Sequence, residues 1–299
     1  MKRVFILLLL LTVAACHSPT EAELSVVSGD QFAKESKTYK PGKDTGFGKY
    51  KTASLLGEKK VVLTFDDGPH KTQTPRLLDI LKKLDVKATF FVMGDKSKRY
   101  PKIIKRMRDE GHIVAMHAFD HKSSNSLTKK KFESSIEESV KIIKEAGWDK
   151  KEMYFRFPYG AYGSRKLSYH HMESLKKVSK RLYKQNCFNF VFWDVDTSDW
   201  YLRKLRNTKA KIIETVFAYL EGGRAWDFYY YKKYKRARKI KREKALEGGV
   251  ILLHDIHKST VDSVEPLVNK LREHNYEIVP LNEVEEFEYQ DNLVCNLNH

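Results

Sequence analysis

Residues 61–69 of this 299-residue chain read Val-Val-Leu-Thr-Phe-Asp-Asp-Gly-Pro. The first five residues form the near-continuous apolar run that is typical of a parallel strand covered on both faces. Two carboxylates and a turn-forming Gly-Pro pair follow at once. Taken alone, residues 66–69 have the composition of an ordinary turn, so their meaning depends on how the other strands of the chain end.

Short apolar or aromatic runs recur along the chain and alternate with helical patterns. Seven of them are predicted strands, at residues 61–65, 88–92, 112–116, 154–157, 190–193, 250–253 and 277–281. Apolar residues at helical spacing lie between them at 74–84, 100–107 and 131–146. This order predicts an α/β fold with a parallel sheet, either open or closed into a barrel. With 41% hydrophobic residues the chain can bury a core, which excludes an intrinsically disordered protein.

Polar side chains follow five of the predicted strands, where the chemistry of α/β barrels collects. We expect them on one rim: Asp66, Asp67, His117, His121, Arg156, Asp199 and His254, with His70, Asp120, Asp194, Asp196, Asp255 and His257 beside them without assigned roles. His117 and His121 are spaced to chelate a metal from one helical face. Two histidines and one aspartate make a catalytic metal shell with open positions. The residues alone do not say whether Asp66 or Asp67 is the ligand, and Arg156, if buried, needs a carboxylate partner.

These motifs stand in the order in which they occur in a known family. Over roughly residues 60–287 the chain resembles the polysaccharide deacetylases, the NodB-homology group or carbohydrate esterase family four. The matching stretches are Thr64 to Pro69, Ala88 to Gly94, the His117/His121 pair, Arg156 to Gly160, Asp199-Trp200 and Leu252 to Asp255. The resemblance implies a deformed (β/α) barrel of about seven parallel strands. It also implies metal-dependent hydrolysis of N-acetyl groups on amino sugars.

The resemblance further implies a role for each matching residue. Asp67, His117 and His121 would hold a divalent metal, zinc, while Asp66 acts as general base and His254 as general acid. Supporting roles fall on the remaining matches: Arg156 orients Asp66, Asp199 holds His254, and Pro158, Tyr159, Trp200 and Leu252 bind substrate. One departure is Ala118, where the family commonly has Ser or Thr. We expect metal binding to survive it, with altered affinity.

The N-terminus predicts export. Met1-Lys2-Arg3 precedes an apolar run that is too short to span a bilayer, which indicates a secretory signal. Small residues directly before Cys16 resemble a lipobox, so we expect a signal peptide at 1–15, a lipidated Cys16 and a polar tether at 16–59. An ordinary signal with an incidental cysteine is the alternative. Export and the formal net charge of +17 favour anionic envelope polymers and lipid headgroups over nucleic acid as partners.

The remaining segments divide into a domain, an insertion and a tail. We expect the deacetylase domain at 60–290, a basic and aromatic insertion at about 201–247, and a tail at 291–299. Tyr230, Tyr234, Ala237 and Lys241 have helical spacing, so the insertion is either a solvated helix resting on the domain or a platform for glycan. Cys187 and Cys295 form one disulfide or remain separate thiols.

Placement and resemblance together point to a hydrolase that deacetylates N-acetylglucosamine units of peptidoglycan at the membrane or cell surface. Chitooligosaccharides, poly-N-acetylglucosamine and acetylated xylan remain alternative substrates. A glycan-binding module that keeps the fold without turnover is the alternative from another class, for which Ala118 leaves room. We expect no nucleic acid and no obligate protein partner.

Overall fold

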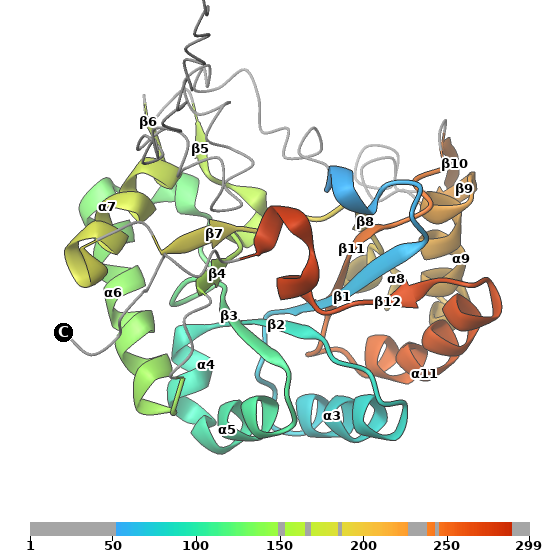
Figure 1. Cartoon of the computed structure of the whole chain (residues 1–299), viewed down its shortest axis with the longest axis horizontal. Coiled ribbons are helices and arrows are strands. Elements are labelled where there is room, and N and C mark those ends of the chain that lie inside the picture. The colour runs from blue at the N-terminus through green and yellow to red at the C-terminus, as the bar shows by residue number, and fades with distance from the viewer. Residues whose placement is uncertain are drawn as a thin grey trace, which may run out of the picture.

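The computed structural model describes residues 52–148, 153–164, 169–184, 187–226, 238–242 and 245–288. A curved parallel sheet lies at the centre and helices surround it (Figure 1). Its strands are β1 (Lys60–Asp66), β2 (Thr89–Val92), β3 (Ile113–Met116), β4 (Met153–Phe155), β7 (Phe188–Phe190), β8 (Val195–Asp196), β11 (Gly249–His254) and β12 (Glu277–Ile278). They are arranged in the order β7-β4-β3-β2-β1-β11-β8, and β12 pairs with the start of β1.

The two edges of this sheet are joined by the chain itself. β7 and β8 stand at opposite ends of the strand order, although only residues 191–194 separate them in the sequence. The N–H of Val191 donates to Phe155 O at 3.0 Å, and the N–H of Asp194 donates to Val250 O at 2.9 Å. The linker therefore extends both edge pairings and bends the sheet round. The deformed (β/α) barrel that the family resemblance implies is confirmed.

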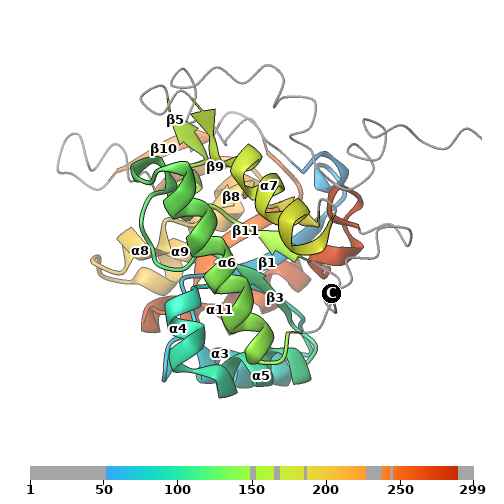
Figure 2. The same cartoon turned by 90° about the vertical axis from the view of Figure 1, so that its left-hand side faces the viewer.

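Helices cover the outer face of the sheet. They are α3 (Gln73–Lys83), α4 (Gly94–Arg99), α5 (Pro101–Asp109), α6 (Lys129–Glu145), α7 (His171–Tyr183), α8 (Asp199–Leu202), α9 (Thr208–Leu220) and α11 (Lys258–Glu273). Figure 2 shows α6 crossing one side of the molecule with α7 packed next to it. The helices α3, α5 and α6 confirm the three predicted helical patterns. Each turns its apolar stripe inward, as Leu77, Leu78 and Leu81 do in α3.

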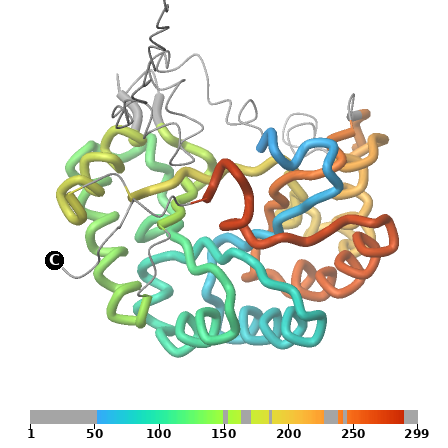
Figure 3. The backbone as a smooth tube through the Cα atoms, viewed as in Figure 1, coloured from blue at the N-terminus to red at the C-terminus, as the bar shows by residue number. Residues whose placement is uncertain are grey.

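Side chains of β1 alternate between two apolar clusters, which explains its unbroken apolar run. Val61, Leu63 and Phe65 belong to the cluster under the helices, whereas Val62 belongs to a second cluster inside the barrel. The short helices η2 (Ala53–Leu55), η6 (Leu281–Glu283) and η7 (Glu285–Phe287) supply apolar residues to the inner cluster. The two ends of the described chain lie close together there (Figure 3), since the N–H of Ser54 donates to Glu286 Oε1 at 2.9 Å.

Two predictions about boundaries need correction. Residues 190–193 are not one strand, because the chain leaves β7 at Phe190 and crosses to β8. The domain extends to Thr52, since residues 52–59, which we assigned to the tether, pack on it through Leu55 and Ser54. The signal segment, Cys16, the rest of the tether and the tail at 291–299 lie outside the described residues.

The insertion at about 201–247 does not carry its predicted helix as far as Lys241. It contains α8, α9 and an antiparallel hairpin of β9 (Gly223–Trp226) and β10 (Lys239–Arg242), so Lys241 lies in a strand. Ammonium groups of Lys211 and Lys239 lie 5.3 and 5.4 Å from the centre of the Trp226 ring. Lysine side chains of the protein itself therefore lie near this ring. Tyr230, Tyr234 and Ala237 lie outside the described residues.

The smaller elements complete the fold. Two 3-10 turns, η3 (Ser124–Ser126) and η4 (Pro158–Gly160), and a short hairpin of β5 (Gly163–Ser164) and β6 (Tyr169–His170) follow β3 and β4. Cys187 is buried and disulfide-bonded, and its partner lies outside the described residues. Among the residues that the structure describes, no helix has the length and apolar character needed to cross a membrane.

Asp194 lies away from the rim where we expected it. Its Oδ1 accepts the N–H of Thr52 at 3.1 Å, and its Oδ2 accepts the N–H of Val250 at 2.8 Å, near the amino-terminal end of β11. This aspartate therefore ties the start of the domain to the closure of the barrel.

We expect Asp194→Ala to lower the free energy of unfolding. Two buried N–H groups would lose their acceptor, and each such loss costs about 1–3 kcal/mol. Urea denaturation measures this change, and zinc titration of the metal-free protein should give the wild-type affinity. An unchanged unfolding midpoint together with weakened zinc binding would place Asp194 in the site after all.

Candidate active site

Three groups with metal-ligand chemistry meet at the carboxyl ends of β1 and β3. Ligand atoms of Asp67, His117 and His121 all lie within 4.8 Å of one another. Asp67 Oδ1 is 3.5 Å from His117 Nε2 and 3.1 Å from His121 Nε2. His117 Nδ1 lies 2.8 Å from the carbonyl oxygen of Arg156, so Nδ1 donates and Nε2 faces the site.

This group fits a metal ion. Asp67 Oδ1 is buried and has no hydrogen-bond donor. Burial by itself would raise the pKa of Asp67, but His121, His254 and His117 hold it below its ordinary value. Burial lowers the pKa of His117. The carboxylate is thus anionic and the imidazole neutral, which are the forms that bind metals such as zinc.

Asp66, next to the metal donors, is held by an arginine instead. Arg156 is completely buried, and its Nη1 donates to Asp66 Oδ1 at 2.7 Å and to Thr64 Oγ1 at 2.8 Å. Asp66 Oδ2 lies 3.7 Å from His117 Nε2. One carboxylate oxygen of Asp66 is therefore fixed by a permanent cation, while the other faces the metal donors.

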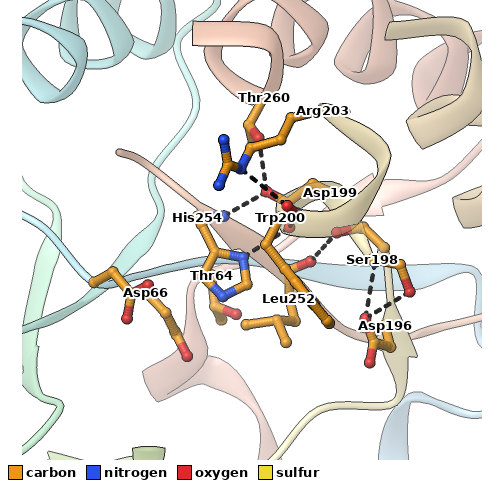
Figure 4. A network of polar contacts seen from close by, with 12 residues as sticks. Thr64, Asp66, Asp196, Ser198, Asp199, Trp200, Arg203, Leu252, His254 and Thr260 are labelled. Carbon is orange, nitrogen blue, oxygen red and sulfur yellow. Dashed lines mark hydrogen bonds and ion pairs between the residues drawn. The ribbon is translucent and has the colours of Figure 1, made fainter. Parts of the chain in front are cut away.

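His254 enters the same site from the end of β11. Its Nδ1 lies 2.7 Å from Asp199 Oδ1, and Asp199 Oδ2 accepts the hydroxyl of Thr260 at 2.7 Å (Figure 4). Burial alone would lower the pKa of His254, but the carboxylate of Asp199, aided by Asp67 and Asp66, raises it to about 10. His254 is therefore an imidazolium at neutral pH and can donate a proton.

The predicted substrate-binding residues line the loops around these groups. Trp200 and Leu252 lie beside His254 (Figure 4), and the N–H of Trp200 donates to Asp199 Oδ1 at 2.8 Å. Pro158 and Tyr159 lie in η4. Tyr159 is 62% exposed, and its ring centre is 4.4 Å from that of the His121 ring. The structure thus brings together all the site residues that we assigned within the domain.

The loops that carry the site share an unusual backbone conformation. Asp67, Ala118, Tyr159 and Ser198 have φ values of 74°, 63°, 60° and 51°. Non-glycine residues rarely adopt this left-handed region, and they concentrate at functional sites where surrounding contacts hold them. At Ala118 a hydrogen bond from the N–H of Gly94 to the Ala118 carbonyl, 2.9 Å long, supports the loop between the two histidines.

Three of the rim residues without assigned roles contact residues that are close to them in sequence. His70 Nδ1 accepts the N–H of Gln73 at the start of α3, Asp120 pairs with Lys122, and Asp196 accepts the N–H of Ser198. His257 is half-buried 6.2 Å from His254, ring centre to ring centre, and Asp255 is completely buried. Thr64 and Thr260 were missed because single threonines carry no signal until Arg156 and Asp199 are placed beside them.

Comparison with known proteins agrees with this arrangement. A family model described as "Polysaccharide deacetylase" matches residues 54–175. The peptidoglycan-N-acetylmuramic acid deacetylase PdaA of Bacillus subtilis is 30% identical over 219 residues, which cover 73% of this chain and 68% of PdaA. The chain belongs to the polysaccharide deacetylase family. This family is metal-dependent, and the Asp67-His117-His121 group is the possible metal site in this member.

Two further relatives match most of the length of this chain. A solved structure described as "T48 deacetylase with substrate" matches with a TM-score of 0.55 at 33% identity, over 78% of this chain and 92% of that chain. The peptidoglycan-N-acetylglucosamine deacetylase PgdA of Listeria monocytogenes is 28% identical over 279 residues, which are 92% of this chain and 49% of PgdA. The chain thus spans about half the length of that relative.

The charge on His254 can be tested in the metal-free protein. We expect NMR titration of the imidazole to give a pKa near 10 and Asp199→Asn to move it toward 6.5, because the neutral amide no longer stabilises the cation. Since the folded-state pKa is the higher one, the resulting stabilisation is complete below about pH 6.5 and disappears as the pH rises through about 10. An unchanged pKa in Asp199→Asn would show that another group holds the proton.

Proposed function

We propose that this protein is a zinc-dependent N-deacetylase that hydrolyses the acetamido groups of peptidoglycan. One observation carries this proposal: the Asp67-His117-His121 donors lie beside two different proton-transfer groups. Asp66 is an aspartate paired with Arg156, and His254 is a histidine paired with Asp199. An amide hydrolase needs one group that accepts a proton from water and another that donates a proton to the leaving amine.

The residues of the site divide the reaction between them. Zinc bound to Asp67, His117 and His121 would polarise the acetyl carbonyl and make the attacking water more acidic. Asp66 accepts a proton from that water through Oδ2, while Arg156 keeps Oδ1 in place. The backbone N–H near Tyr159 donates to the developing oxyanion. His254 then protonates the amine nitrogen as the C–N bond breaks, so that acetate and a free amine leave.

The remaining side chains fit an acetyl-bearing sugar. Trp200 and Leu252 form the walls against the acetyl methyl group, and Pro158 and the exposed Tyr159 contact the sugar ring. Among sugars we propose N-acetylglucosamine, the substrate that PgdA is named for, with N-acetylmuramic acid, the substrate that PdaA is named for, as the outcome to be separated by experiment.

We also propose that the domain works outside the cytoplasm on a lipid anchor. Support comes from the signal-like segment at 1–15, the lipobox-like Cys16 and the polar residues that follow it up to Thr52. The disulfide at Cys187 suits an oxidising compartment. Extended at about 3.3–3.6 Å per residue, such a tether lets the domain search wall material on the order of 120 Å from the membrane.

Acetate release is the direct test of this function. We expect the purified protein to release acetate from peptidoglycan, to release less from chitooligosaccharides of the same acetyl content, and to stop after treatment with a chelator. Re-addition of zinc should restore release. Analysis of the product sugars separates glucosamine from muramic acid. Wild-type binding to peptidoglycan without any acetate release would instead identify a glycan-binding module.

Asp66→Asn tests the assignment of the base. The variant keeps a side chain of the same shape beside Arg156 but cannot accept a proton at neutral pH. We expect zinc binding within about twofold of wild type and a loss of kcat of about 10²–10⁴-fold, which is the usual size of a general-base contribution. Asp67→Asn is the matched control, because it should lose zinc affinity. Retained turnover in Asp66→Asn would remove Asp66 from the reaction.

A further inference from the structure

The backbone of Asp67 helps to set the position of its carboxylate. Its buried Oδ1 has no hydrogen-bond donor, in contrast to the Asp66 carboxylate, which Arg156 holds. The backbone of Asp67 has a φ of 74°, a left-handed conformation that costs a non-glycine residue about 1–3 kcal/mol. Contacts around the loop of residues 67–70 must therefore keep this aspartate in place.

Part of that support comes from α4 and the residue before it. Lys96 Nζ donates to the carbonyl oxygen of Asp67 at 2.7 Å, and the N–H of Met93 donates to the carbonyl oxygen of Gly68 at 2.9 Å. These bonds hold the loop from one side. They do not account for the space next to the Cα atom of Gly68.

The carboxyl group of Asp255 fills that space. A Cβ atom added to Gly68 would lie 2.2 Å from Asp255 Oδ2 and 2.5 Å from Asp255 Oδ1. Since the φ of Gly68 is not positive, glycine is needed here for space and not for its backbone freedom. Asp255 is completely buried, and its Oδ1 has no hydrogen-bond partner.

A buried threonine connects Asp255 to the far end of the same loop. Thr74 Oγ1 donates to Asp255 Oδ2 at 2.5 Å and accepts the N–H of His70 at 2.7 Å. The Thr74 hydroxyl thus donates to the Asp255 carboxyl group and accepts from the backbone of the loop. Asp255 and Thr74 together contact the loop beneath Gly68 and at His70, on either side of Pro69.

We propose that Asp255 and Thr74 are positioning residues for the metal site, because they seat the loop that presents Asp67 to His117 and His121. Neither side chain forms a hydrogen bond or ion pair with the side chains of Asp67, His117 or His121. Their effect on zinc passes through the backbone of residues 67–70. The proposal rests on the proposed zinc site, and it adds two residues that none of the site motifs assigns to metal binding.

Thr74→Val is the decisive variant, because it removes one hydroxyl group without changing volume or charge. We expect zinc, titrated into the metal-free protein against a competing chelator, to bind about tenfold more weakly, the lower end of what outer residues contribute. Turnover should return when zinc is saturating, and KM for the acetylated glycan should stay at its wild-type value.

Thr215→Val is the matched control. Thr215 is also a completely buried helical threonine, and its hydroxyl donates to Lys211 O in α9. The unfolding temperature should fall in both variants, and further in Thr74→Val, because Thr74 loses two hydrogen bonds and Thr215 loses one. Zinc affinity should fall only in Thr74→Val. A merely structural role of Thr74 would lower the unfolding temperature and leave the zinc affinity of both variants equal.

A pair of substitutions tests the contact under Gly68. Gly68→Ala should weaken zinc binding by tenfold or more, because Cβ and the Asp255 carboxyl group cannot occupy one space. In the double variant with Asp255→Ala the clash is gone, so zinc should bind no more weakly than in Asp255→Ala alone. Additive losses in the double variant would overturn the proposal, as would wild-type zinc affinity in Thr74→Val. A wild-type protein that binds no zinc would instead overturn the proposed function.

Discussion

A single buried arginine joins the closure of the barrel to the chemistry of its rim. The guanidinium of Arg156 has no exposed surface and donates to Asp66, to Thr64 and to the carbonyl oxygens of Val191 and Phe192. Burying such a cation is costly unless its donors are satisfied. The carbonyls belong to the linker between β7 and β8, so the barrel has to close for this charge to be accommodated.

The same residue also fixes a metal donor through its backbone. The carbonyl oxygen of Arg156 accepts the hydrogen of His117 Nδ1, which turns Nε2 toward Asp67. The N–H of Arg156 in turn donates to Met116 O, which continues the pairing of β3 and β4. A shift of β4 against β3 would therefore displace the base and a ligand together. The register between β3 and β4 thus also determines the geometry of the site.

The sequence pattern predicted those features that depend on residues close together in the chain. The apolar runs predicted a parallel sheet, and the polar residues after them predicted one rim, because the carboxyl ends of parallel strands meet at one edge. The closed barrel followed from the family resemblance of the ordered motifs. The sequence pattern did not predict the break after Phe190, since a segment that crosses the barrel interior is as apolar as a strand. Asp194 lies away from the rim, and Asp255 contacts Gly68. Both placements depend on partners more than 50 residues away in sequence, for which a single sequence carries no signal.

The separation of the two proton-transfer groups follows from the sheet itself. Asp66 and His254 are register partners on the adjacent parallel strands β1 and β11, so their backbones are held one strand spacing apart, about 4.8 Å. Here Asp66 is paired with a fixed cation, Arg156, and His254 with a fixed anion, Asp199. Asp199 thereby keeps His254 in the protonated form that its step requires, and Arg156 keeps Asp66 in place beside the metal donors.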